Sequence, residues 1–241
     1  MSRMNRRTFV DSLTAACATS TAGRHRVEPA QCLAHARADH LIYATTHLER
    51  GMRHIEDMTG ITAVYGGSQP GRGTRNALIR LGPTCYLEIR SPDPAQTGTK
   101  AQGPFFDRIA EFPRLFRWAV RSDQLEREIR RGDRVGVSLG ELRNGERRRQ
   151  DGSMVTWRMT DPGILLADGV VPFFIDWGNS PHPATDAPAG AILVGLRAEH
   201  HAPEAVRSML RGLDVPLPVL AGAAPKLIAT ISSSRGTIEL S

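Results

Sequence analysis

The chain has 241 residues, of which 40% are hydrophobic and 23% charged, a composition typical of a soluble globular protein with one large or two small domains. Its net charge of +6 comes almost entirely from scattered arginines, and aromatic residues make up only 5%. This pattern disfavours nucleic-acid binding, which combines a concentrated basic patch with stacking aromatics. The one basic run, at 146–149, is expected in a turn. We therefore expect a small-molecule partner and no nucleic acid.

The N-terminal segment is expected to lie outside the fold. Residues 5–10 contain Arg6-Arg7 and resemble a twin-arginine export signal, but the apolar stretch that should follow is poor. We expect 1–36 to be a leader and the protein to be cytoplasmic, with periplasmic export through this signal as the alternative. No apolar run approaches the ~20 residues needed to span a membrane. The three cysteines have no CxxC spacing, which predicts neither a disulfide framework nor a zinc cluster.

Three segments each show the order strand, helix and shorter strands. In the first, at 38–92, a strand and an amphipathic helix precede three strands. The second is expected to have strands at 116–121, 135–142, 154–159 and 170–177 and a helix at 123–131. The third is expected to have strands at 192–199, 216–220, 226–232 and 237–240 and a helix at 203–213. The fold class is thus α+β, with repeated βαβββ modules that form curved mixed sheets around a central cleft. Residues 37–178 would contain two paired modules, and 190–241 a third.

Alternation along the strands assigns side chains to faces. Tyr86, Glu88 and Arg90 share one face of their strand. Each segment ends on a strand that carries one acid, at Glu88, Asp176 and Glu239. A carboxylate on a mostly apolar strand needs a partner, because burying it alone is costly. His40, near the start of the first strand, is expected to converge with Glu88 inside the cleft as a divalent-metal site.

Other readings of these residues stay open. His40 could be a plain core or cap histidine, and Glu88 could be the ion-pair partner of an arginine. Glu199-His200-His201 looks like a metal cluster, yet adjacent residues on a strand point oppositely. His182 could guard the cleft, although a loop histidine is the simpler interpretation. Gly71-Arg72-Gly73 suggests a phosphate loop, but no helix follows it and no Lys-Ser/Thr pair is present.

Four stretches together resemble the glyoxalase-like domain family of the vicinal oxygen chelate superfamily, over about 38–241. They are Asp39-His40-Leu41-Ile42-Tyr43, 71–78 with Tyr86-Leu87-Glu88, 172–178 and 235–240. The resemblance implies paired βαβββ modules that form a curved sheet around a cleft. It also implies, in many members, a divalent metal bound by residues on the first and last strands of each module.

The resemblance carries over to individual positions. His40, Glu88 and Asp176 match the metal ligands, whereas the first strand of the second module offers only Phe116 or Arg117, neither of which binds metal. Three protein ligands plus water are therefore the most that the sequence provides. The metal would chelate adjacent substrate oxygens and act as a Lewis acid.

The remaining site residues receive roles around that metal. Catalytic residues would be Glu88 as ligand or general base, Tyr86 as a hydrogen-bond donor to a developing oxyanion, and Arg158. Arg158 and Arg90 are expected to face the cleft and bind a substrate carboxylate. Trp118 and Phe174 would contact the substrate as apolar walls.

The leading functional hypothesis is a metal-dependent lyase or isomerase acting on a small oxygenated metabolite. The alternative is a metal-free small-molecule binding or resistance protein, with Trp118, Trp157, Phe174 and Trp177 as walls. An extradiol-type dioxygenase would need two histidines and one carboxylate on iron, and only one histidine can be placed. Because three modules fit poorly into a two-fold arrangement, a partner chain could cover one sheet edge, which favours a homodimer.

Overall fold

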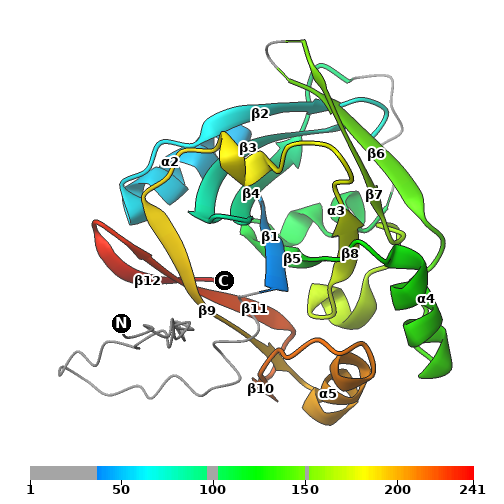
Figure 1. Ribbon diagram of the computed structural model, residues 1–241. Helices are drawn as coiled ribbons and strands as arrows, with labels where there is room; N and C mark the ends of the chain where they lie inside the picture. Colours follow the sequence, from blue (N-terminus) through cyan, green and yellow to red (C-terminus); the bar gives the residue numbers. More distant parts are fainter. Residues whose placement is uncertain (1–36, 97–102, 150–151) are drawn as a thin grey trace, which may run out of the picture.

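The computed structural model describes residues 37–96, 103–149 and 152–241 (Figure 1). The expected leader at 1–36 lies outside the described residues, so the export signal stays a prediction. In the part that is described, no helix is long and apolar enough to cross a membrane.

The first module contains β1 (Ala38–Ala44), α2 (Leu48–Thr59), β2 (Val64–Gln69), β3 (Thr74–Gly82) and β4 (Cys85–Pro92). Helix α2 ends at Gly60, whose left-handed backbone (φ 76°) lets its N–H bond the carbonyl of Glu56 at 2.7 Å. The short helices α3 (Pro104–Asp107) and η1 (Ile109–Glu111) lead to the second module.

The second module repeats this order with β5 (Arg114–Arg121), α4 (Leu125–Arg134), β6 (Arg143–Arg148), β7 (Met154–Met159) and β8 (Phe173–Asp176). The short helix η2 (Leu166–Gly169) precedes β8. The expected strand at 135–142 does not form. Val137 and Leu139 are instead buried in a loop, and the strand begins at Arg143. Much of the basic run predicted in a turn is thus part of β6.

The two modules form one eight-stranded sheet with the order β2-β3-β4-β1-β5-β8-β7-β6. In each module the first and last strands run parallel, β1 beside β4 and β5 beside β8, and an antiparallel β1–β5 pair joins the modules. The sheet curls until its two edge strands approach each other, where Arg147 Nη1 on β6 donates to the carbonyl oxygen of Gly66 on β2 at 2.5 Å (Figure 1). The predicted α+β fold with a curved mixed sheet is confirmed.

The rest of the chain forms a separate small sheet. After η3 (Pro183–Thr185) come β9 (Ala191–His200), α5 (Pro203–Gly212), β10 (Val219–Ala221), β11 (Lys226–Ser233) and β12 (Gly236–Leu240). Its order is β10-β9-β11-β12. The elements follow each other as in a module, but here the second strand, not the last, lies parallel to the first.

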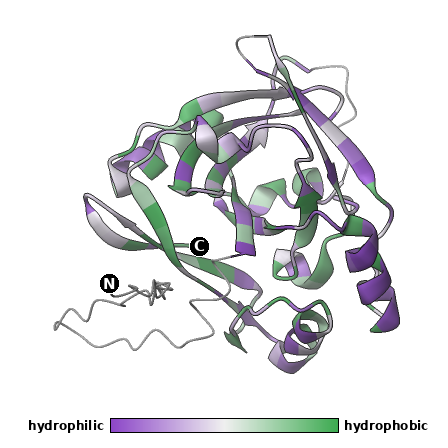
Figure 2. Cartoon of the chain, viewed as in Figure 1, coloured by the Kyte–Doolittle hydropathy of each residue, from purple (hydrophilic) through white to green (hydrophobic). Residues whose placement is uncertain are grey.

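Alternation on the central strands separates two environments. Leu41 and Leu87 point to the outer face of the large sheet and join a core shared with the small sheet and the helices. His40 and Tyr86 occupy the inner, concave face. In Figure 2, β9 and β11 carry long apolar stretches beside the large sheet, whereas α4 is mostly hydrophilic. The curved sheet thereby turns a row of polar side chains toward its hollow.

Candidate active site

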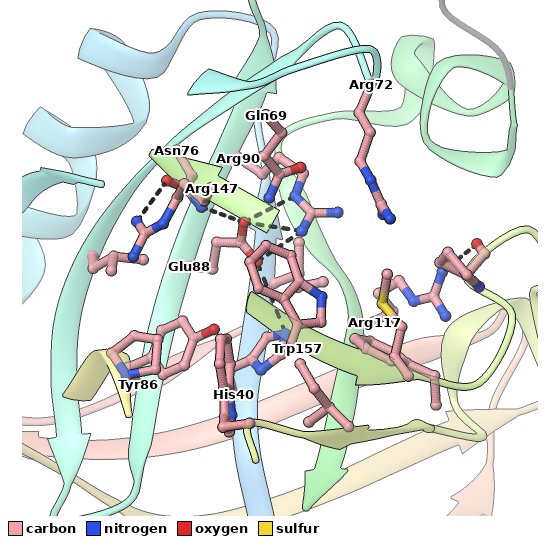
Figure 3. A pocket seen from close by; sticks show the side chains of 18 residues that line it. His40, Gln69, Arg72, Asn76, Tyr86, Glu88, Arg90, Arg117, Arg147 and Trp157 are labelled. Atoms are coloured by element: carbon pink, nitrogen blue, oxygen red, sulfur yellow. Dashed lines mark hydrogen bonds and ion pairs between the residues drawn. The ribbon is translucent and has the colours of Figure 1, made fainter. Parts of the chain in front are cut away.

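The concave side of the large sheet encloses a cavity of about 540 Å³, counted out to its open mouth (Figure 3). Both modules contribute to its walls. The polar and charged lining residues are His40, Gln69, Arg72, Asn76, Tyr86, Glu88, Arg90, Arg117 and Arg147, and the apolar ones include Ile42, Leu78, Trp157, Met159, Phe173 and Trp177.

His40 and Glu88 face each other inside this cavity. They come from the parallel neighbours β1 and β4, whose register pairs His40 with Tyr86 and Ile42 with Glu88. Alternation turns both side chains to the concave face, where His40 Nε2 lies 3.9 Å from Glu88 Oε2. Both residues are buried.

Asp39 binds the Nδ1 side of the His40 imidazole. Its fully buried carboxylate contacts three nitrogens: His40 Nδ1 at 2.7 Å, Trp177 Nε1 at 3.0 Å and His182 Nε2 at 3.1 Å. His182 Nδ1 accepts a hydrogen bond from the Ala184 backbone N–H, so its proton resides on Nε2, which donates to Asp39. This network fixes the orientation of both rings.

The ionised form of Asp39 determines the tautomer of His40. Burial alone would raise the pKa of this carboxyl, but hydrogen bonds from His182 and His40 outweigh that effect and lower the pKa to about 2. An ionised carboxylate only accepts hydrogen bonds, so His40 Nδ1 donates to it. In the neutral imidazole the lone pair of Nε2 is then directed toward the cavity, as in a histidine positioned for proton transfer.

The carboxylate of Glu88 is engaged on both oxygens. Asn76 Nδ2 donates to Oε1 at 2.6 Å, Arg90 Nε donates to Oε1 at 3.0 Å, and Arg90 Nη2 lies 2.9 Å from each oxygen. Burial raises the pKa of Glu88, but Arg90, His40 and Asn76 together bring it below its ordinary value. Glu88 is therefore an anion of low basicity, and it lies next to the imidazole.

Tyr86 stacks on the face of His40, with ring centroids 4.8 Å apart. Burial, followed by the nearby charges of Glu88 and Asp39, raises the pKa of its hydroxyl well above the usual value. The phenol is thus protonated at neutral pH and can only donate or accept a hydrogen bond. Trp177 and Trp157 continue this aromatic wall, with centroids 5.3 Å apart.

Four arginines and one carboxylate make up the charged lining of the cavity. Arg117 is buried. Its Nη1 donates to the carbonyl of Pro162 at 3.0 Å, and its guanidinium lies 4.4 Å from the centroid of the Phe173 ring. Burial, and then the charge of Arg90, lower its pKa to about 9, so it is still cationic at pH 7. Burial also lowers the pKa of Arg72 and of Arg147.

Other predicted site residues lie away from the cavity. Arg158 is on the opposite face of β7 from Trp157 and pairs with Glu126 at the surface. Asp176, at the end of β8, accepts the backbone N–H of Gly178 at 2.8 Å and lines an open surface groove with Arg158.

Trp118 and Phe174 are fully buried in the core behind the sheet, where Trp118 Nε1 donates to the carbonyl of Val170 at 2.8 Å. Glu239 pairs with Arg197 on the small sheet.

A family model described as a glyoxalase-like domain matches residues 38–213, which is more than half of the chain. The chain belongs to the glyoxalase-like domain family. With this family it belongs to the vicinal oxygen chelate superfamily, as the sequence motifs predicted. No curated protein matches the chain.

Several solved structures of low sequence identity resemble this glyoxalase-like protein. The crystal structure of a hypothetical protein from Staphylococcus aureus is 14% identical, with a TM-score of 0.62, and the match covers 85% of this chain and 98% of that one. A methylmalonyl-CoA epimerase of Mycobacterium tuberculosis is 21% identical, with a TM-score of 0.39, covering 60% and 90%. A Streptomyces coelicolor methylmalonyl-CoA epimerase in complex with 2-nitronate-propionyl-CoA is 17% identical, with a TM-score of 0.41, covering 61% and 98%. The likeness to the Staphylococcus aureus protein concerns the fold alone.

The cavity of this glyoxalase-like protein does not fit the metal set that the resemblance implied. Within residues 37–96, 103–149 and 152–241, no three His, Cys, Asp or Glu side chains are arranged so that they could hold a metal ion together. His40 and Glu88 are close, but Asp176 lies elsewhere and the oxygens of Glu88 already bind Asn76 and Arg90. On β5 and β8, the strands from which the second module would supply ligands, the residues that line the cavity are Arg117, Phe173 and Ile175. The surrounding guanidinium groups repel a divalent cation.

Several residues of the candidate site were not assigned a role from the sequence. Asp39 was noted only as the residue before His40, and only the tertiary structure brings Trp177 and His182 to its carboxylate. Arg117 was noted only as unable to bind metal, and Arg72 only within a rejected phosphate loop. Arg147 belongs to a run that was expected in a turn. The sequence did contain a signal for the three arginines, because arginine recurs on each of these segments.

Proposed function

We propose that this protein is an isomerase or lyase that moves a proton at a carbon next to a carbonyl group of a small oxygenated metabolite, with His40 as the general base. The supporting observation is the Asp39–His40 pair. The Nδ1 proton is held by a buried, ionised carboxylate, and Nε2 is left facing the cavity 3.9 Å from Glu88.

The proposed step uses only groups of the chain. Nε2 of His40 takes the proton of the substrate C–H bond, and the electron pair of that bond moves onto the adjacent carbonyl oxygen to give an enolate. Asp39 and Glu88 flank the imidazolium that forms and stabilise its charge. Arginine side chains stabilise the enolate oxygen. Return of the proton from Nε2 to the other face, after the enolate turns over in the cavity, gives an isomerase, and loss of a leaving group from the next carbon gives a lyase. A divalent metal has no part in this proposal, because the donor set does not fit one.

Proton transfer can be measured without knowing the natural substrate. The protein is incubated in D₂O with a panel of small 2-oxo and 3-oxo acids, and loss of the C–H signal is followed by NMR. We expect at least one acid to exchange, and His40→Gln to reduce the exchange rate by about 100-fold or more, since general-base catalysis contributes on this order. The matched control is His54→Gln, because His54 is exposed on α2. Exchange that is equally fast in His40→Gln would overturn the assignment.

The second candidate is a binding protein that uses the same cavity without turnover. The observation in its favour is that Glu88 is paired with Arg90 and hydrogen-bonded by Asn76, which suits a fixed binding wall beside Trp157 and Trp177. Tight binding of a panel member with no C–H exchange in the wild type would support this candidate over the enzyme.

A further inference from the structure

We propose that the ligand of this cavity is an organic acid whose carboxylate or phosphate group is bound by Arg72, Arg90 and Arg117. This inference deepens the proposed function by naming the substrate class, and it rests on that function only for the position of the reacting carbon near His40.

Arg117 provides the clearest evidence of an anion site. It is only 6% exposed, yet its Nε has no hydrogen-bond partner among the described residues. Nη1 is its one hydrogen-bonded nitrogen in that part of the chain, and the partner is a neutral carbonyl. Burying a cation without an anion is costly, so a structural arginine at this depth would be expected to have a carboxylate partner. A ligand oxyanion would provide this partner.

Arg72 and Arg90 complete the subsite. Figure 3 shows Arg72 and Arg117 reaching from opposite sides toward the space beside Arg90. The pKa values of the arginines agree with this arrangement. Burial lowers the pKa of Arg72 and Arg117 most, and the charge of Arg90 lowers both further. Three guanidinium groups around one space offer enough donors for the oxygens of a carboxylate or phosphate.

Nearby carboxylates do not neutralise this cluster. Glu88 is the one acid among the described lining residues, and Arg90 already engages it on both oxygens. Asp161 lies close enough to affect Arg72 and Arg117, but its own oxygens bind Arg143 and the backbone N–H of Gly163. With Arg147 included, the lining carries four cations against one anion. The excess favours an anionic ligand.

The three arginines lie where the cavity meets an outer groove. That groove has Phe105 and Phe106 from the α3 segment in its wall, and Arg72, Arg90 and Arg117 line both spaces. The acidic group is therefore held at the junction, with the reacting carbon further in toward His40. The substrate class is a small organic acid with an acidic group at one end and an activated C–H bond at the other.

The test uses malonate, inorganic phosphate and the neutral malonamide as probes in isothermal titration calorimetry on the full chain. We expect malonate or phosphate to bind and malonamide not to bind. Arg117→Gln should weaken anion binding by about 10- to 100-fold, the range for loss of a charge-assisted hydrogen bond. Arg72→Gln, at a less buried position, should also weaken it by about tenfold and serves if Arg117→Gln fails to fold. The matched control is Arg158→Gln, which removes the same charge from the surface pair with Glu126 and should bind like the wild type.

Two outcomes would overturn the inference: no binding of either anion, or anion binding that is equal in Arg72→Gln and Arg158→Gln. Preference for malonate or for phosphate identifies the acidic group. The proposed function fails separately. Anion binding by the wild type without C–H exchange in any protein would leave the subsite standing and refute the proton-transfer role.

Discussion

Replacing Asp39 with asparagine tests the network behind His40 most directly. The buried carboxylate accepts hydrogen bonds from His40, His182 and Trp177. An asparagine keeps the shape but turns an NH₂ group toward at least one of these donors, so that one buried hydrogen bond becomes a clash of two donors.

The magnitude follows from the pKa of Asp39. Lowering it from the ordinary 3.8 to about 2 corresponds to about 2 kcal/mol of stabilisation by the ionised group at neutral pH. Because the folded pKa lies below the unfolded one, this stabilisation is fully present above about pH 5 and is lost as the pH falls toward 2. The asparagine side chain cannot titrate, so the difference between wild type and Asp39→Asn should shrink by about 1 kcal/mol between pH 5 and pH 3.

The assay is urea unfolding of both proteins at several pH values across this interval. The control is Asp57→Asn, an exposed acid on α2 whose removal should cause no comparable pH-dependent difference. If the free-energy difference between wild type and Asp39→Asn is the same at pH 5 and pH 3, the carboxylate does not hold the network as described. The same variant should lose C–H exchange, since His40 can then carry its proton on Nε2.

Three further outcomes are expected. Gly66→Ala should destabilise the protein by about 1–3 kcal/mol in urea unfolding, because the added Cβ would overlap Asn76 and Arg147, and an unchanged midpoint would contradict the close approach. Trp118→Ala should lower the free energy of unfolding by about 3–5 kcal/mol in the same assay, since the indole is fully buried and donates a hydrogen bond to the carbonyl of Val170. The malonate affinity of this variant, measured near 10 °C, should not change. Dialysis against EDTA should leave both C–H exchange and malonate binding as they were, and a loss restored by added Mn²⁺ or Zn²⁺ would show that a metal acts here after all.

The sequence predicted the half of the site that lies on the first module. There the alternation on β4 is clear, since Tyr86, Glu88 and Arg90 are polar and their neighbours apolar, and the parallel partner strand carries His40. The sequence therefore indicates which face of β4 lies on the concave side of the sheet.

The second module gave no such signal. Strand β8 is apolar on both faces, with Phe173 toward the cavity and Phe174 toward the core, so alternation does not indicate the concave face. This is why Asp176 was expected in the cleft although it lies outside it. On β7 the alternation is clear, but the cavity is lined by the apolar face with Trp157 and Met159, and the polar face with Arg158 points outward. Edge strand β6 is polar throughout, which hid the inward-facing Arg147 within an apparent turn.

Arg147 belongs both to the closing contact between β2 and β6 and to the cations of the cavity. A ligand that contacted this guanidinium would couple occupancy of the cavity to cohesion of the two modules. An anion that drew it inward would take it from Gly66, and by reciprocity any change that separates the two edge strands would then alter the affinity for that anion.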